Sequence, residues 1–329
     1  VLVSRPLSGN IATAYDYYYW NLPGRTPIQN PNLKPVKTVD YEVGFQQKLN
    51  NSSAIKLSMY YKEFRDLIQQ RTLLYTAPAP ISSYTIYDNL DFGTAKGFNV
   101  QYDLRRTGNI EMTVAYTLGF ADGTGSDENS QRNLISRGFN LRTLSPLSYD
   151  ERHRLVATID YRYGSGKRYN GPRVMGKDIL ARTGINIQTT AVSGRPFTQT
   201  RFASRFGGRG LDGSINGSRM PWNFTIDMKI DKRLKLFASE GYKGMNVNVY
   251  VRVQNLLDAR NVVNVYSASG AANDDGYLQS IDGLIEINNT RTTRPQELNN
   301  FLEIYSWRLL NPNNFSLPRR IIAGVIIGF

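Results

Sequence analysis

The chain has 329 residues, with 40 Lys and Arg against 27 Asp and Glu, a formal net charge of +13 and a mean hydropathy of −0.41. It contains no run of about 20 apolar residues, which excludes a transmembrane helix. The absence of cysteine and the single histidine, His153, exclude disulfides, thiolate metal sites and cysteine catalysis, and disfavour a catalytic triad. The cations are spread along the chain instead of forming a block, so we expect no nucleic-acid partner.

The first segment, residues 6–37, is irregular and rich in Tyr, Asn, Pro and Gly. A structureless segment of this length is unusual in a compact soluble domain, whereas extracellular loops of a membrane barrel often reach it. Its aromatic residues Tyr17, Tyr19 and Trp20 would stack a flat or sugar-like ligand, or they pack within the loop. Both interpretations stay open.

Nine later segments alternate apolar and polar residues with the period of a β-strand. They are residues 38–49, 53–67, 98–105, 110–120, 155–163, 183–194, 222–230, 247–254 and 318–329. Charged residues on the second face of nearly every strand would be costly in a sandwich core, but they suit a wet or plugged lumen. The sequence therefore predicts an all-β chain that forms a transmembrane antiparallel β-barrel of outer-membrane type.

The connections between these strands alternate in length. Short turns follow the strands that end near residues 49, 105 and 230, and long polar segments follow the others. Short periplasmic turns and long extracellular loops are typical of outer-membrane barrels, so we expect the last strand to end at the periplasmic rim. The connection of residues 164–182 is longer than this alternation predicts.

The last strand, Pro318–Phe329, has one unbroken apolar face and an aromatic terminus. This face consists of Ile321, Ala323, Val325, Ile327 and Phe329. It resembles the closing strand of an outer-membrane barrel, in which the terminal Phe belongs to the signal that the barrel-insertion machinery recognises. The resemblance implies that this machinery is a partner.

Two further segments narrow the resemblance. Residues 30–35, NPNLKP, followed by 40–45, DYEVGF, resemble the NPxLKPE…YEvGf motif of TonB-dependent outer-membrane transporters, with Val36 in place of the usual Glu. Residues 251–258, VRVQNLLD, resemble the penultimate strand of that family. Residues 92–98, 149–153 and 311–320 are most similar to the transporters of the Bacteroidota.

The resemblance implies a barrel of roughly 22 strands closed by an N-terminal plug. Residues 1–329 would supply about the last nine or ten strands of one barrel domain, while the plug and the earlier strands are absent from this sequence. The implied location is the outer membrane of a Gram-negative bacterium. No catalytic residue and no cofactor is implied, so we expect a protein that is not an enzyme.

The implied function is active import of a scarce nutrient, either a siderophore, a vitamin, a glycan or a peptide. Energy would come from TonB, ExbB and ExbD through the missing N-terminal region. A passive porin-like channel and a structural or secretion-associated subunit of an envelope complex are the alternatives. A surface lipoprotein or a larger envelope complex is a further candidate partner.

The glycine-rich segment between the sixth and seventh strands carries five arginines and one acid, Asp212. They are Arg195, Arg201, Arg205, Arg209 and Arg219. Guanidinium groups match carboxylate and phosphate oxygens, so an anionic cargo or lipopolysaccharide would bind there. In the alternative, this is a solvated loop whose arginines pair elsewhere.

Asp274 and Asp275 lie in an acidic turn, residues 273–276. Carboxylates in such a turn are potential Ca²⁺ ligands, although a purely structural acidic turn is the commoner case. We predict no other metal site.

Overall fold

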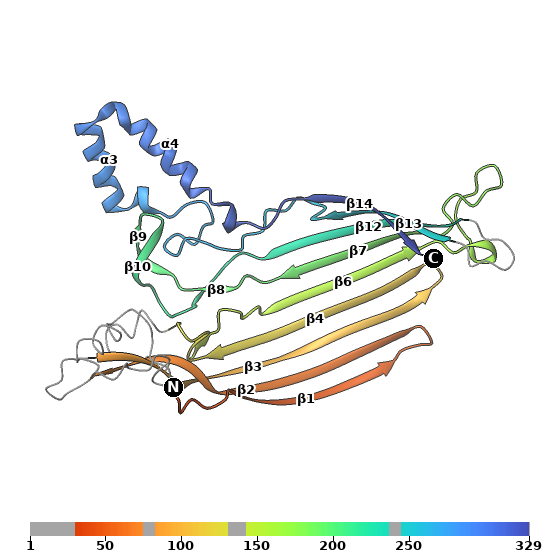
Figure 1. Ribbon diagram of the computed structural model, residues 1–329, viewed down its shortest axis with the longest axis horizontal. Coiled ribbons are helices and arrows are strands. Elements are labelled where there is room, and N and C mark those ends of the chain that lie inside the picture. Colours follow the sequence, from red (N-terminus) through yellow and green to blue (C-terminus); the bar gives the residue numbers. More distant parts are fainter. Residues whose placement is uncertain (1–29, 75–82, 131–142, 237–244, 329) are drawn as a thin grey trace, which may run out of the picture.

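The computed structural model describes residues 30–74, 83–130, 143–236 and 245–328. Nine long strands form one curved antiparallel sheet in which each strand lies beside its neighbours in the chain (Figure 1). They are β1 (Lys37–Lys48), β2 (Ser53–Leu74), β3 (Ser83–Thr107), β4 (Ile110–Gly123), β6 (His153–Arg162), β7 (Thr183–Val192), β12 (Asn223–Leu236), β13 (Met245–Gln254) and β14 (Arg320–Gly328).

The predicted strands and their apolar face are confirmed. Apolar residues pair with apolar residues across the whole sheet, from Tyr41 with Tyr61 on β1 and β2 to Val253 with Ile321 on β13 and β14. Strands β2 and β3 run further than the periodicity predicted, and their pairing shifts near Asp66, whose φ is 59°. A bulge of this kind bends a strand and re-aims it.

The other face of the sheet carries ion pairs between strands. Lys62 lies 2.7 Å from Asp40, and Arg106 pairs with both Glu111 and Asp160. These pairs are compatible with a polar lumen and not with a dry core.

A further ion pair on this face, between Arg162 and Asp231, also spans three strands. Arg162 of β6 reaches across β7 and binds Asp231 of β12 with two hydrogen bonds of 2.9 and 2.6 Å. Its guanidinium lies over Gly184 of β7, where a Cβ atom would collide with it. A glycine at this position therefore lets the pair form.

The two ends of the sheet differ (Figure 1). At one end, the short-turn end, lie residues 49–52, 108–109 and 163–182 and the end of β14. At the other, the long-loop end, lie residues 124–130, 143–152, 193–222 and 255–319. This arrangement confirms the alternation predicted from the connection lengths.

The long-loop end carries further structure. Strand β5 (Ser145–Pro146) pairs with β4, β8 (Pro196–Phe197) pairs with β11 (Ser218–Arg219), and β9 (Thr200–Ser204) pairs with β10 (Gly207–Leu211). Two helices, α3 (Ile281–Thr293) and α4 (Leu298–Leu309), rise beyond this end (Figure 1). Neither these nor any other helix among the described residues is long and apolar enough to cross a membrane.

The two helices differ from the sequence prediction, which gives residues 255–317 as one long connection. Ser280 caps α3 by accepting a hydrogen bond from the backbone N–H of Gly283 at 3.1 Å, and Asp282 stands in the first turn. A short 3-10 turn, Pro295–Glu297, separates α3 from α4. The chain therefore folds back on itself as a helical hairpin.

Candidate functional site

A buried carboxylate holds the helical hairpin on the β9–β10 hairpin. Asp275, which is fully buried, accepts hydrogen bonds from the Tyr305 hydroxyl at 2.6 Å and from the backbone N–H groups of Phe206 and Tyr277 at 2.8 and 2.9 Å. Phe206 lies in the turn between β9 and β10, and Tyr305 lies on α4. One side chain thus joins three segments that are distant in sequence.

Aromatic rings complete this junction. The ring of Tyr305 stacks on that of Phe206 with centroids 4.9 Å apart. The ring centroids of Tyr277 and Phe301 lie 6.0 and 5.9 Å from that of Tyr305. The guanidinium of Arg308 lies 4.3 Å from the Phe206 ring, which is a cation–π distance. Phe206 itself has a φ of 57°, a left-handed backbone that its contacts stabilise.

The environment of Tyr305 fixes its protonation. Burial, together with the hydrogen bond to Asp275, raises the pKa of the Tyr305 hydroxyl above its ordinary value. The folded state therefore favours the neutral hydroxyl. The stability that the neutral Tyr305 hydroxyl contributes is fully present below the ordinary tyrosine pKa of about 10. It is lost as the pH rises through the higher pKa that Tyr305 has in the folded state.

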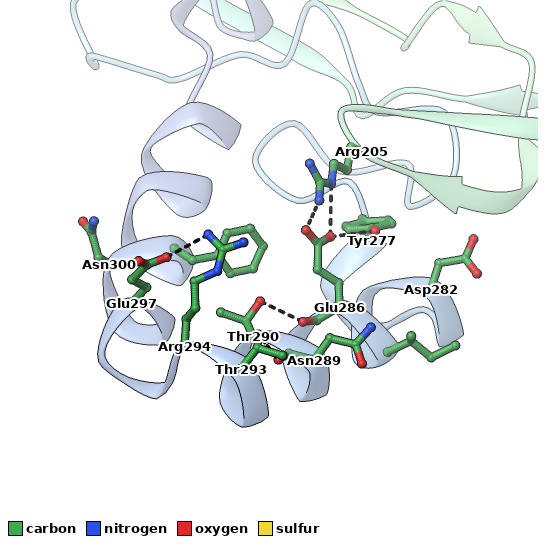
Figure 2. Close-up of a pocket in the computed structure, with 12 residues that line it drawn as sticks. Arg205, Tyr277, Asp282, Glu286, Asn289, Thr290, Thr293, Arg294, Glu297 and Asn300 are labelled. Atoms are coloured by element: carbon green, nitrogen blue, oxygen red, sulfur yellow. Dashed lines mark hydrogen bonds and ion pairs between the residues drawn. The ribbon is translucent and has the colours of Figure 1, made fainter.

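A cavity of about 580 Å³ opens between α3 and α4 (Figure 2). Its wall consists of Arg205, Tyr277, Asp282, Ile285, Glu286, Asn289, Thr290, Thr293, Arg294, Glu297, Asn300 and Phe301. This volume falls within the usual range of about 300–1,000 Å³ for ligand sites.

The charges in the cavity wall are largely paired. Glu286 accepts hydrogen bonds from Arg205 at 3.1 Å and from the Tyr277 hydroxyl at 2.8 Å (Figure 2). Arg294 pairs with Glu297 at 3.3 Å. Beside the cavity, Arg209 pairs with Asp282 at 2.7 Å.

The remaining wall offers uncharged groups. The amides of Asn289 and Asn300 are exposed, and the partly exposed ring of Phe301 supplies flat apolar surface, whereas the ring of Tyr277 is buried. Amides form hydrogen bonds in both directions, and aromatic rings stack on apolar faces. The cavity therefore suits an uncharged, hydrogen-bonding ligand better than a strong anion.

The structure separates the five predicted arginines into two groups. Arg195 pairs with Glu151 at 2.8 Å, and Arg219 pairs with the buried Asp150, so this group fastens the start of β6 to the β8–β11 pair. Arg205 and Arg209 pair with acids of α3 beside the cavity. Arg201 is exposed and has no ion pair within the described ranges.

The other predicted residues are placed as follows. Both oxygens of Asp275 are engaged by protein donors, and Asp274 accepts from the backbone N–H of Gly276 at 2.8 Å, so their observed role is structural. The residues that the structure describes contain no group of three or more His, Cys, Asp or Glu that could hold a metal ion. Ile321, Ala323, Val325 and Ile327 lie on β14, whereas Phe329, Tyr17, Tyr19 and Trp20 lie outside the described residues.

Most of the cavity wall was missed by the sequence analysis. The spacing of Leu298, Phe301, Tyr305 and Leu309 follows a helical period, and Pro295 is typical of a helix start. These signals were sufficient to predict a helix in the last long connection. They could not have revealed that Glu286 meets Arg205, which is 81 residues away in sequence.

Comparison with known proteins gives a consistent result. The family model for the β-barrel of TonB-dependent receptor-like proteins matches residues 5–256. No curated protein matches the chain.

Several solved structures are similar to this chain over part of their length. The outer membrane transporter YddB from Escherichia coli has 13% identity and a TM-score of 0.48, and the match covers 72% of this chain and 31% of that one. The ferric-catecholate import receptor Fiu from E. coli has 12% identity and a TM-score of 0.42, with coverage of 74% and 26%. The FrpB iron transporter from Neisseria meningitidis has 13% identity and a TM-score of 0.42, with coverage of 71% and 29%. The chain thus spans about a third or less of each of these proteins.

The sheet, its continuous apolar face and its charged second face define a transmembrane β-barrel protein of the Gram-negative outer membrane. The chain belongs to the TonB-dependent receptor-like β-barrel family. This assignment rests on the family match, which covers most of the chain.

Proposed function

We propose that this chain is part of an outer-membrane importer of a scarce nutrient that is energised through TonB, ExbB and ExbD. The family match over residues 5–256 carries this proposal. In the proposed importer the long-loop end faces the cell exterior and captures cargo, and the short-turn end faces the periplasm. The barrel-insertion machinery would recognise β14.

We also propose that residues 1–329 are the C-terminal part of a single barrel domain that also contains a plug and earlier strands. Among the described residues, β1 pairs only with β2 and β14 only with β13. Unpaired strand edges are not tolerated in lipid, because their backbone groups lack hydrogen-bond partners. Additional strands that pair with β1 and β14 would supply hydrogen-bond partners to both edges.

The cavity between α3 and α4 is our candidate for the first cargo site, and a neutral oligosaccharide is the cargo class that it favours. Two facts support this choice. Arg205 and Arg209, which would attract an anion, are already paired with Glu286 and Asp282. The exposed amides of Asn289 and Asn300 and the partly exposed ring of Phe301 match the hydroxyl groups and apolar faces of sugars.

Two other proposals concern Arg201 and the outer surface of the helical hairpin. Arg201 is the best-placed of the five arginines for lipopolysaccharide, because it is exposed and has no ion pair in the described part of the chain. The helical hairpin also offers an exposed surface to a surface lipoprotein or a larger envelope complex. A passive channel is the alternative that differs most, since it would need neither cargo site nor energy.

The Asn289→Ala variant tests the cargo site. We expect neutral oligosaccharides to bind the full-length variant about tenfold more weakly than the native protein, since one or two hydrogen bonds are lost. Titration with a panel of neutral and acidic oligosaccharides measures this. Asn288→Ala is the matched control, because Asn288 lies on the same helix, is exposed and is not part of the cavity wall. Equal affinities for the two variants, or tighter binding of acidic than of neutral sugars, would contradict the assignment.

A further inference from the structure

The long connection between β6 and β7, residues 163–182, lies at the short-turn end of the sheet (Figure 1). Tyr169 gives it a fixed shape. The Tyr169 side chain is 8% exposed, its hydroxyl donates to the Pro172 carbonyl at 2.5 Å, and it accepts from the Leu180 N–H at 3.3 Å. This connection is therefore a built element and not a loose turn.

Aromatic residues place this connection at the edge of the lipid band. On the apolar face, His153 stacks with Tyr116 and Trp222 near the long-loop end. Tyr161 and Tyr163 contact each other near the short-turn end, with centroids 5.2 Å apart. His153 and Tyr161 begin and nearly end β6, so they lie roughly 26 Å apart at about 3.3 Å per residue. Because strands of such barrels tilt by about 35–45°, this separation corresponds to a height of about 20 Å, close to that of an apolar band about 25 Å tall between two aromatic girdles.

The connection leans toward the lipid-facing side. Lys232 shares the apolar face of β12 with Met228 and Ile230, and its Nζ donates to the Ile179 carbonyl at 2.6 Å. The ring of Tyr169 lies 6.0 Å from that of Tyr163. The stretch of residues 172–181 thus stands beside the headgroup layer of the leaflet at this end.

The tip of the connection combines apolar and cationic side chains. Val174 and Lys177 close a tight turn with hydrogen bonds of 3.2 and 2.9 Å, and Met175 and Gly176 have φ values of 48° and 73°. Asn-Gly is the favoured pair for such a turn. A positive φ is uncommon for a residue with a side chain such as Met175. Met175 is nevertheless 97% exposed, with Val174 at 50% and Ile179 at 42%. Packing within the chain does not account for these three apolar side chains.

Four cations belong to the same connection, namely Lys167, Arg168, Arg173 and Lys177, and all four are exposed. Arg173 pairs with Asp178 at 2.9 Å, whereas the other three make no ion pair in the ranges that the structure covers. Exposed apolar side chains and exposed cations on one connection fit a layer of anionic headgroups above acyl chains.

We propose that the tip of this connection is a lipid anchor. Val174, Met175 and Ile179 insert into the headgroup layer, and Lys167, Arg168 and Lys177 bind acidic phospholipids of the leaflet at the short-turn end. The partner is the phospholipid surface itself.

A spin label at Met175→Cys in the full-length protein tests the anchor. Residues 1–329 contain no cysteine, and any cysteine elsewhere in the protein is first replaced by serine. The protein is placed in vesicles of phosphatidylcholine, or of phosphatidylcholine with about one third phosphatidylglycerol. We expect access of a water-soluble nickel chelate to the label to fall about fivefold or more in the acidic vesicles, and to recover in about 1 M salt, where charges are screened within about 3 Å.

Two variants sharpen this test. A label at Ser165→Cys should be insensitive to lipid charge, because Ser165 belongs to the same connection but lines a cavity with Arg162 and Arg233 on the polar side. In the Lys167→Gln/Arg168→Gln/Lys177→Gln background, the effect of acidic lipid at Met175→Cys should disappear. Equal access to the Met175 label in both lipids would overturn the proposal, and so would protection that requires an added periplasmic protein.

Discussion

The Asp231→Ala variant is expected to lower the free energy of unfolding of the full-length barrel by about 3–5 kcal/mol. The side chain of Asp231 is 3% exposed and that of Arg162 is 19% exposed, so the change takes both hydrogen-bonded oxygens from a largely buried guanidinium and leaves it only the 3.6 Å ion pair with Asp160. Denaturant titration of the protein in detergent micelles measures the loss. Gly184→Ala should act in the same direction, because its methyl group occupies the place of the Arg162 guanidinium.

Two controls separate a buried pair from a general effect of charge removal. Asp40→Ala removes the partner of Lys62 on the same face, and it should have little measurable effect because both side chains are exposed to about 40%. The double variant Arg162→Ala/Asp231→Ala should be more stable than Asp231→Ala, since no charge is left unpaired. A double variant that is less stable than Asp231→Ala would contradict this explanation.

The Asp275→Ala variant is expected to release the helical hairpin from the β9–β10 hairpin while the barrel stays folded. The change leaves the N–H groups of Phe206 and Tyr277 and the hydroxyl of Tyr305 without their acceptor. Unsatisfied buried donors cost about 1–3 kcal/mol each. Trypsin cleavage after the exposed Arg291 should therefore accelerate about 100-fold, which corresponds to about 3 kcal/mol.

Asp274→Ala is the matched control, because the side chain of Asp274 accepts a local hydrogen bond from the backbone N–H of Gly276, two residues away. Cleavage of this variant should change by less than about tenfold. If both variants are cleaved at the same rate, Asp275 does not hold the junction. If a chelator alone releases the hairpin, these aspartates bind a metal instead.

The sheet was predictable because its signal is local. Alternation within each strand places Tyr41, Val43 and Phe45 on one face without reference to any other strand, and the observed register confirms it. Where β2 and β3 continue beyond residues 67 and 98, the chain leaves the lipid band and alternation no longer marks the strand. The bulge near Asp66 depends on pairing with β3, which no local pattern records.

The candidate site was harder to predict, since its chemistry depends on distant contacts. Five arginines in a glycine-rich segment indicated an anion site, but four of them meet acids elsewhere in the chain, such as Glu151 and Glu286. Asp275 resembled a metal ligand in sequence, yet it is the acceptor at a three-segment junction. Charge patterns in a loop indicate which side chains are present and not which partners they reach.

Energy-dependent uptake tests the central proposal most directly. Cells that produce the full-length protein are given, in labelled form, the neutral oligosaccharide that binds it best, and accumulation is measured with and without a protonophore. A TonB-energised importer predicts accumulation that falls to the level of cells without the protein when the proton gradient is removed. Uptake that continues unchanged in the presence of the protonophore would contradict active import and would identify a passive channel.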